Sequence, residues 1–153
     1  MGIMNISLLV SGLYNRDDRI AYQCLKQLEE ASEHSAGVYP FIGDFIDMLG
    51  HEHSYIRTRG LILIAANAKW DRDFRIDEII DRFLKHIQDE KPITARQCIR
   101  ALPKIAAHKP ELKQDIVAAL RRADTSVYAE SMQPLVQKDI AAALKEIEKI
   151  PRS

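Results

Sequence analysis

The 153-residue sequence predicts an all-α protein, an α-α superhelix (solenoid) of about four helical hairpins within one domain spanning residues 1–153. Two observations lead to this fold class. An apolar pattern with helical spacing recurs after 38 residues, and an arginine recurs after 38 and then 39 residues. A helix–turn–helix unit repeated at such an interval is typical of proteins in which each unit buries its apolar face against its neighbours.

The apolar pattern marks the first helix of each hairpin. From Val38, apolar residues occur at i, i+3, i+4, i+7, i+8 and i+11, and the same six positions are apolar from Ile76. This spacing is typical of a helix with one buried face. Weaker copies of the pattern begin at Ile6 and at Ile116. The residues of the two clear copies are Val38, Phe41, Ile42, Phe45, Ile46 and Leu49, then Ile76, Ile79, Ile80, Phe83, Leu84 and Ile87.

The recurring arginine marks the second helix of each hairpin. Arg19, Arg57 and Arg96 occupy equivalent positions, and we interpret them as structural residues of the repeat. The fourth copy is degenerate, as expected for a terminal unit with one side in water. The units then span roughly 4–36, 37–72, 73–109 and 110–150. The residues three and six positions after each arginine are Tyr22 and Leu25, Gly60 and Leu63, and Ile99 and Leu102, with Tyr128, Ser131 and Pro134 in the fourth copy.

Prolines and caps mark helix ends. Pro40, Pro92 and Pro110 are expected in first helical turns, where a missing N–H costs nothing. Pro103 and Pro134 fall inside periodic segments, which predicts a kink at each or a split helix at the second. Further caps are expected at Asn15, Asp73 and Asp124, and the uniformly apolar segment 60–68 is expected to be a helix packed between layers.

These residues resemble HEAT repeats. Ile56-Arg57 and Ala95-Arg96, the latter running on to Ala101-Leu102, are similar to the second helix of that family, although Gly60 stands where the family prefers Ala. The resemblance implies second helices that line a concave, partner-binding face. Segments 57–71 and 92–112 are also similar to small uncharacterised bacterial proteins labelled SufBD, which implies an accessory role in iron–sulfur assembly and brings no catalytic motif.

Composition limits the classes of partner. Lys plus Arg and Asp plus Glu number 22 each, so the net charge is zero and no overall positive field favours nucleic acid or an anionic membrane. Cys24 and Cys98 form no CxxC motif. The longest uncharged run, residues 1–15, is too short to span a bilayer as a helix, and no secretory signal is evident. We therefore expect a cytoplasmic protein without membrane association or cofactor.

The segment 91–110 carries the strongest charge bias, with no acidic residue. Arg96, Arg100, Lys104 and His108 recur every four residues and form one basic line on a helix. We expect Arg100, Lys104 and His108 on the concave face, where they would bind an acidic protein segment or phosphates. The alternative is an ordinary solvated face whose charges pair with carboxylates of adjacent helices, and Arg96 is expected to be mainly structural in that way.

A second candidate cluster combines aromatic residues and arginine. Tyr55, Arg59 and Trp70 belong to residue types enriched at binding hot spots, and we include them in the partner-binding face. Trp70-Asp71 near arginines also resembles, at a distance, HEAT-like alkylpurine DNA glycosylases. The alternative is that Trp70 packs between repeats.

No motif for catalysis or metal binding is evident. His51 and His53 form an HxH pair in a predicted loop without a third ligand, and neither a nucleophile elbow nor a phosphate-binding glycine loop occurs. The sequence therefore predicts a non-enzymatic scaffold for a protein partner of unknown identity. Nucleic-acid binding, base excision and iron–sulfur assembly remain alternatives.

Overall fold

The computed structural model describes residues 5–151, in which all regular secondary structure is helical. The all-α prediction is confirmed: eight α-helices and five short 3-10 helices, with no strand, make up this part of the chain. The predicted start of the first unit at residue 4 and both ends of the predicted domain lie outside the described residues.

The longer helices are α2 (Asp18–His34), α4 (Ser54–Ala66), α6 (Pro92–His108) and α8 (Gln133–Glu148); the shorter ones are α1 (Ile6–Gly12), α3 (Ile42–Met48), α5 (Arg75–Leu84) and α7 (Lys113–Arg122). The 3-10 helices are η1 (Tyr39–Phe41), η2 (Ala68–Trp70), η3 (Lys85–Gln88), η4 (Pro110–Leu112) and η5 (Thr125–Val127).

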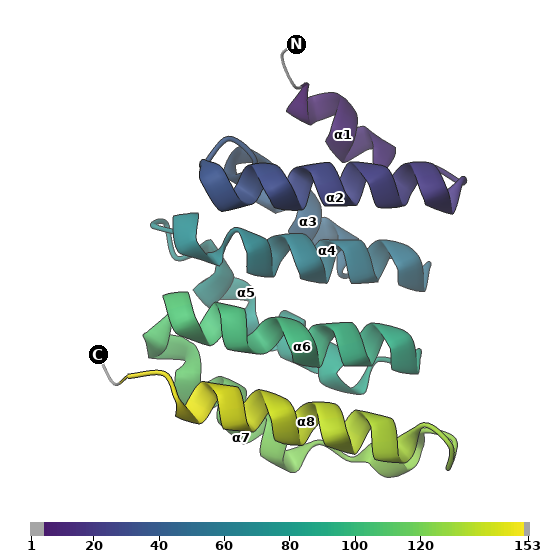
Figure 1. Ribbon diagram of the computed structural model, residues 1–153, viewed down its shortest axis with the longest axis vertical. Helices are drawn as coiled ribbons and strands as arrows, with labels where there is room; N and C mark the ends of the chain where they lie inside the picture. The colour runs from purple at the N-terminus through teal and green to yellow at the C-terminus, as the bar shows by residue number, and fades with distance from the viewer. Residues whose placement is uncertain (1–4, 152–153) are drawn as a thin grey trace.

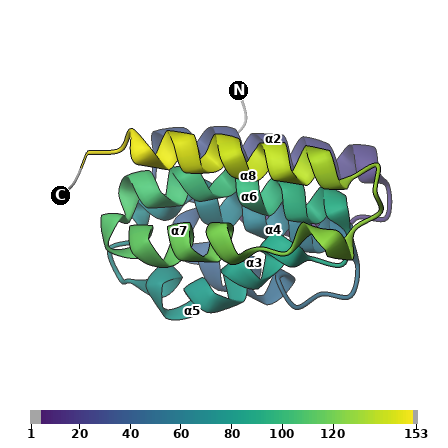
Figure 2. The ribbon, with the colours of Figure 1, turned by 90° about the horizontal axis from the view of Figure 1, so that it is seen from below.

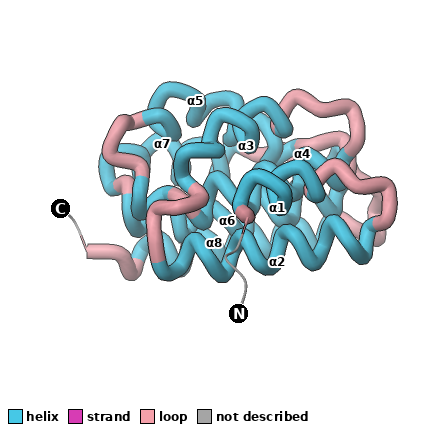
Figure 3. Tube along the Cα trace, turned by 90° about the horizontal axis from the view of Figure 1, so that it is seen from above, coloured by secondary structure: helices cyan, strands magenta, loops and turns pink. Residues whose placement is uncertain are grey.

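The helices lie in two layers. The four long helices lie side by side and run in the same direction (Figure 1), and the short helices lie on one side of them (Figures 2 and 3). Within the long-helix layer, α4 contacts α2 and α6, and α6 contacts α8. We call the side of this layer that faces away from the short helices the outer face.

The predicted apolar stripes form the core between the layers. Val38, Ile42, Phe45, Ile76 and Phe83 are fully buried. Phe41 and Ile79 are the two positions of the clear copies that are only partly buried. The 3.6-residue periodicity therefore identified the buried face of α3 and α5 correctly.

Helix α4 is buried on nearly every side, which explains its uniformly apolar sequence. Gly60 has a specific role in this packing. A Cβ atom at residue 60 would lie 2.7 Å from the carbonyl oxygen of Phe45 and 2.8 Å from Cβ of Met48. Glycine therefore permits a close approach of α3 and α4 that alanine would obstruct.

Three of the five proline predictions are confirmed, because Pro40, Pro92 and Pro110 lie in the first turns of η1, α6 and η4. The expected kink or split at Pro134 is wrong. Helix α8 begins at Gln133, so this proline also lies in a first turn, where no N–H is needed. Helix α6 continues through Pro103 as one element.

Leu63 in α4 and Leu102 in α6 are fully buried, so substitutions at these positions test the packing of the long-helix layer. Replacing either with alanine is expected to lower the free energy of unfolding by about 2–5 kcal/mol through lost apolar contacts and a residual cavity. Urea denaturation measures the loss. Leu135→Ala is the control, because Leu135 is 40% exposed and its truncation should change stability by about 0.5 kcal/mol or less. A loss below about 1 kcal/mol at both buried sites would contradict the packing.

Candidate interaction surface

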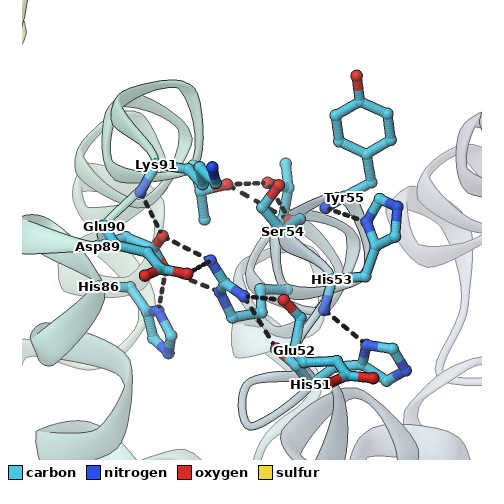
Figure 4. Close-up of polar contacts among 12 residues, drawn as sticks. His51, Glu52, His53, Ser54, Tyr55, His86, Asp89, Glu90 and Lys91 are labelled. Carbon is cyan, nitrogen blue, oxygen red and sulfur yellow. Dashed lines mark hydrogen bonds and ion pairs between the residues drawn. The ribbon is translucent and has the colours of Figure 1, made fainter.

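Arg57 joins the starts of α4 and α6 through a buried ion pair (Figure 4). Its Nε and Nη2 atoms donate to the two carboxylate oxygens of Asp89 over 2.9 and 2.8 Å. Its Nη1 donates to the carbonyl oxygens of His51 and Glu52, each over 2.9 Å. The Arg57 and Asp89 side chains are 8% and 3% exposed. Arg57 is thus a structural residue, held by a carboxylate 32 residues further along the chain.

The Asp89 carboxylate has further hydrogen-bond partners besides the Arg57 guanidinium. Nδ1 of His86 lies 2.7 Å from its carboxylate, and the N–H of Lys91 donates to it over 2.9 Å. Burial disfavours the carboxylate, but the hydrogen bonds with His86 and Arg57 outweigh this, so the pKa of Asp89 lies well below its usual value. The hydroxyl of Tyr128, whose pKa burial raises to about 12, donates to the Asp89 carbonyl oxygen over 2.6 Å.

The other two repeat arginines differ from each other. Nε of Arg96 donates to Asp139 over 2.6 Å and so joins α6 to α8. The Arg19 side chain is 91% exposed, and Asp17, at 3.6 Å, is its only ion-pair partner among residues 5–151. Arg19 is the second residue of α2, whereas Arg57 is the fourth of α4 and Arg96 the fifth of α6. The three arginines thus stand at different positions in their helices, and the predicted structural role of Arg19 is wrong because its side chain lies in solvent.

The residues of the basic line that follow Arg96 on α6 lie on the outer face. Helix α6 is flanked by α4 and α8 and backed by the short helices, so its exposed residues face outward. Arg100 is 53% exposed, with Asp139 at 3.6 Å, and Lys104 and His108 are exposed. Partial burial, with Lys69 and Lys104 nearby, lowers the pKa of His108. The positive charge on the outer face of α6 therefore comes from Arg100 and Lys104, because a lowered pKa favours the neutral form of His108.

The predicted aromatic and arginine cluster is divided by the fold. Tyr55 is 49% exposed at the start of α4. Arg59 is only 8% exposed, because its Nη1 donates to the carbonyl oxygen of Leu13 over 2.8 Å and its Nη2 lies 3.4 Å from Asp18. Nε1 of Trp70 donates to the Ser32 carbonyl oxygen over 2.7 Å. Arg59 and Trp70, which we predicted to face a partner, instead connect α4 and η2 to the preceding unit.

A second buried polar cluster surrounds Lys109. Its Nζ lies 3.1 Å from the carboxylate of Asp71 and 2.6 Å from that of Asp77, and it donates to the Asp71 carbonyl oxygen over 3.0 Å. The Lys109 and Asp71 side chains are 4% and 0% exposed. Burial disfavours the ammonium group, but Asp77 and Asp71 outweigh this and raise the pKa of Lys109.

Asp71 also begins helix α5. Its carboxylate accepts the N–H groups of Arg75 and Ile76 over 3.1 and 2.9 Å, and it accepts the hydroxyl of Tyr39 over 2.5 Å. The predicted cap at Asp73 is therefore wrong. Phe74 adopts a left-handed conformation, with φ of 57°, and this turn directs the first N–H groups of α5 to Asp71.

Two hollows lie between the long helices. One, of about 430 Å³, separates the starts of α4 and α6. A smaller one, of about 200 Å³, lies between α6 and α8. The first is lined by His53, Ser54, Tyr55, Lys91, Pro92, Ile93 and Thr94, and the second by Arg100, Pro103, Asp139, Ala142, Ala143 and Glu146.

The remaining candidate groups serve local structure. The Nδ1 atoms of His51 and His53 accept the N–H groups of His53 and Tyr55. Cys98 is buried, which raises the pKa of its thiol, and Cys24 is half-buried. Within residues 5–151, no three His, Cys, Asp or Glu side chains gather so as to hold a metal ion. None of the helices in this range has both the length and the apolar composition needed to cross a membrane.

The chain matches no protein-family model, no curated protein and no solved structure. The exposed charges of α6 and the hollows beside it are the features of this surface that could contact a partner.

Proposed function

We propose that the chain is a HEAT-like superhelix of helical hairpins, and that it acts as a non-enzymatic scaffold which binds an acidic segment of a partner protein on its outer face. In this proposal the outer face is the concave face of the stack. The positive charge of the exposed Arg100 and Lys104 is the observation that carries the choice of partner.

Hydrogen bonds between residues about one repeat length apart support the repeat architecture. Trp70 bonds to Ser32, 38 residues earlier, and Lys109 bonds to Asp71 at the same separation. Tyr128 bonds to Asp89, 39 residues earlier. Such contacts are expected when equivalent units stack on one another. They support stacking of successive units along the described chain.

The contrast between paired and open cations supports an acidic partner. Arg57 and Arg96 already have carboxylate partners within the fold. Lys104 is exposed, and Arg100 is 53% exposed although Asp139 lies 3.6 Å from it, so both could bind carboxylates of another chain. A glycosylase-like function would need a carboxylate presented to a ligand, and Asp71, the predicted candidate, is buried and paired with Lys109.

Charge reversal tests this proposal. The probes are a fluorescein-labelled twelve-residue glutamate-rich peptide and a DNA duplex labelled in the same way, with binding followed by anisotropy. The Arg100→Glu/Lys104→Glu variant is expected to lose the peptide. Its melting temperature should stay nearly unchanged, because exposed ion pairs contribute only about 0–1 kcal/mol. Arg121→Glu/Arg122→Glu is the matched control, since it makes the same charge change at exposed positions of α7.

Three outcomes would overturn the proposal: the double reversal unfolds the protein, it leaves peptide binding intact, or the wild-type protein does not bind the peptide. Tighter binding of the duplex, with a steep loss of affinity as salt rises, would favour the nucleic-acid alternative instead.

A further inference from the structure

Three basic side chains gather where α4 and α6 end. Lys104 and His108 are exposed on α6, and residues four apart on a helix lie next to each other on one face. Lys69 belongs to η2, which follows α4 and contacts α6. Because α4 and α6 run side by side in the same direction (Figure 1), Lys69 lies at the end of the layer where His108 ends α6. We call Lys69, Lys104 and His108 the basic cluster.

Lys69 has a fixed position in the basic cluster. Its Nζ donates to the Glu33 carbonyl oxygen over 2.6 Å and lies 3.6 Å from the Glu33 carboxylate. The same atom lies 5.4 Å from the centroid of the Trp70 ring, and that ring is held by its bond to Ser32. With these contacts in place and only 26% of the Lys69 side chain exposed, the ammonium group stays beside α6.

The charges around His108 favour its neutral form in the free protein. Partial burial lowers the pKa of His108, and the ammonium groups of Lys69 and Lys104 lower it further, whereas the Glu33 carboxylate acts in the opposite direction. These three charges come from η2, from α6 itself and from the end of α2. Among the described residues, α4, α7, α8, η3 and η4 also contact α6, and none of their charged groups contributes to this shift.

Carboxylates of a bound ligand would reverse this balance. A carboxylate that pairs with Lys104 lies close to the His108 ring, one turn further along α6, and a nearby opposite charge favours the imidazolium form. We infer that His108 takes up a proton from solvent when an acidic segment binds to the outer face of α6, so that the segment binds more tightly as the pH falls. This inference rests on the proposed function and adds the regulation of the same surface.

The direction of the pH effect follows from linkage. The complex holds more protons than the separate molecules, so a lower pH favours the complex. Affinity rises between the pKa of His108 in the complex and its lower pKa in the free protein, and the ordinary histidine value of about 6.5 places this range close to neutral pH. Glutamate carboxylates, with an ordinary pKa of about 4.3, stay ionised there.

Isothermal titration calorimetry with the unlabelled glutamate-rich peptide tests the inference at about pH 8 and about pH 6, because histidine changes charge between these values. At constant ionic strength, the wild-type protein is expected to bind about five-fold more tightly at the lower pH and to take up protons from the buffer. His108→Gln should match the wild-type affinity at the higher pH and lose the increase. His108→Arg, whose charge is permanent, should bind tightly at both. His34→Gln is the matched control, because His34 is 72% exposed at the end of α2 and should keep the increase.

A second measurement tests the basic cluster without any ligand. An NMR titration of the His108 ring in the free protein gives its pKa, which Lys104→Gln should raise toward the ordinary value of about 6.5. Lys91→Gln is the control, because Lys91 precedes the first residue of α6 and should leave this pKa unchanged. An unchanged pKa in Lys104→Gln would overturn the inference.

The calorimetry overturns the inference if the wild-type protein binds the peptide equally well at both pH values, if His108→Gln keeps the increase, or if His34→Gln loses it. The two proposals can be told apart. A peptide that binds at neither pH overturns the proposed function and this inference with it, whereas a peptide that binds at both without proton uptake overturns the inference alone.

Discussion

Replacing Arg57 with alanine is expected to lower the free energy of unfolding by about 3–5 kcal/mol, the usual cost of leaving one partner of a buried ion pair alone. Asp89, with a side chain only 3% exposed, would lose both guanidinium hydrogen bonds. The carbonyl oxygens of His51 and Glu52 would lose their donor as well. Urea denaturation at neutral pH measures the effect.

Arg100→Ala is the control for this change. Arg100 is 53% exposed and lies 3.6 Å from Asp139, so its removal should cost about 1 kcal/mol or less. A double variant, Arg57→Met with Asp89→Leu, should lose less than the sum of the two single changes, because it leaves no unpaired buried charge. A loss below about 1 kcal/mol for Arg57→Ala would contradict the role of the pair.

The dependence of stability on acidic pH is a second measure of the contact between Arg57 and Asp89. The pKa of Asp89 is lower in the folded chain than its ordinary value of about 4, so its contribution to stability is complete above that pH and decreases as the pH falls further. The wild-type protein should therefore lose stability below about pH 4, and Asp89→Asn should make this acid dependence shallower. An unchanged slope in Asp89→Asn would show that other carboxylates account for it.

The elements were predictable because periodicity is a local property of the sequence. The stripe that begins at Val38 and its copy at Ile76 define the core faces of α3 and α5, and their burial follows from spacing alone. The recurrence of arginine correctly predicted structural roles for Arg57 and Arg96 but not for Arg19, which is exposed. The partner of Arg57 was not predictable, since Asp89 lies in a loop that no periodic pattern marks, and only folding brings the two residues together.

The directions of single side chains were harder to predict than the helices that carry them. Arg59 lies two residues after Arg57, a turn of about 200° on a helix, and therefore reaches back to Leu13 instead of toward a partner. The sequence favours Asp73 as the cap of α5, because nothing in it indicates that Phe74 adopts a left-handed conformation. Lys109 belongs to the cation-rich segment 91–110, and nothing in the sequence indicates that it is buried.

Lys109→Ala is the second change expected to have a large effect, a loss of about 3–5 kcal/mol. The Asp71 side chain is completely buried. It would keep its hydrogen bonds from Tyr39, Arg75 and Ile76. It would lose Lys109, its only cation at ion-pair distance among the described residues. The Phe74 ring, whose centroid lies 4.8 Å from Nζ, would lose its contact with the ammonium group.

Two further variants separate charge from packing at this site. Lys109→Met keeps most of the apolar stem and removes the ammonium group, so it should lose nearly as much stability as Lys109→Ala if the ion pairs dominate. Lys104→Ala, five residues earlier on α6 and exposed, should change stability by about 0.5 kcal/mol or less. If Lys109→Met is as stable as the wild-type protein, the stem rather than the charge holds the third unit to Asp71. If both Lys109 variants lose about 3–5 kcal/mol, the link between units 38 residues apart is electrostatic.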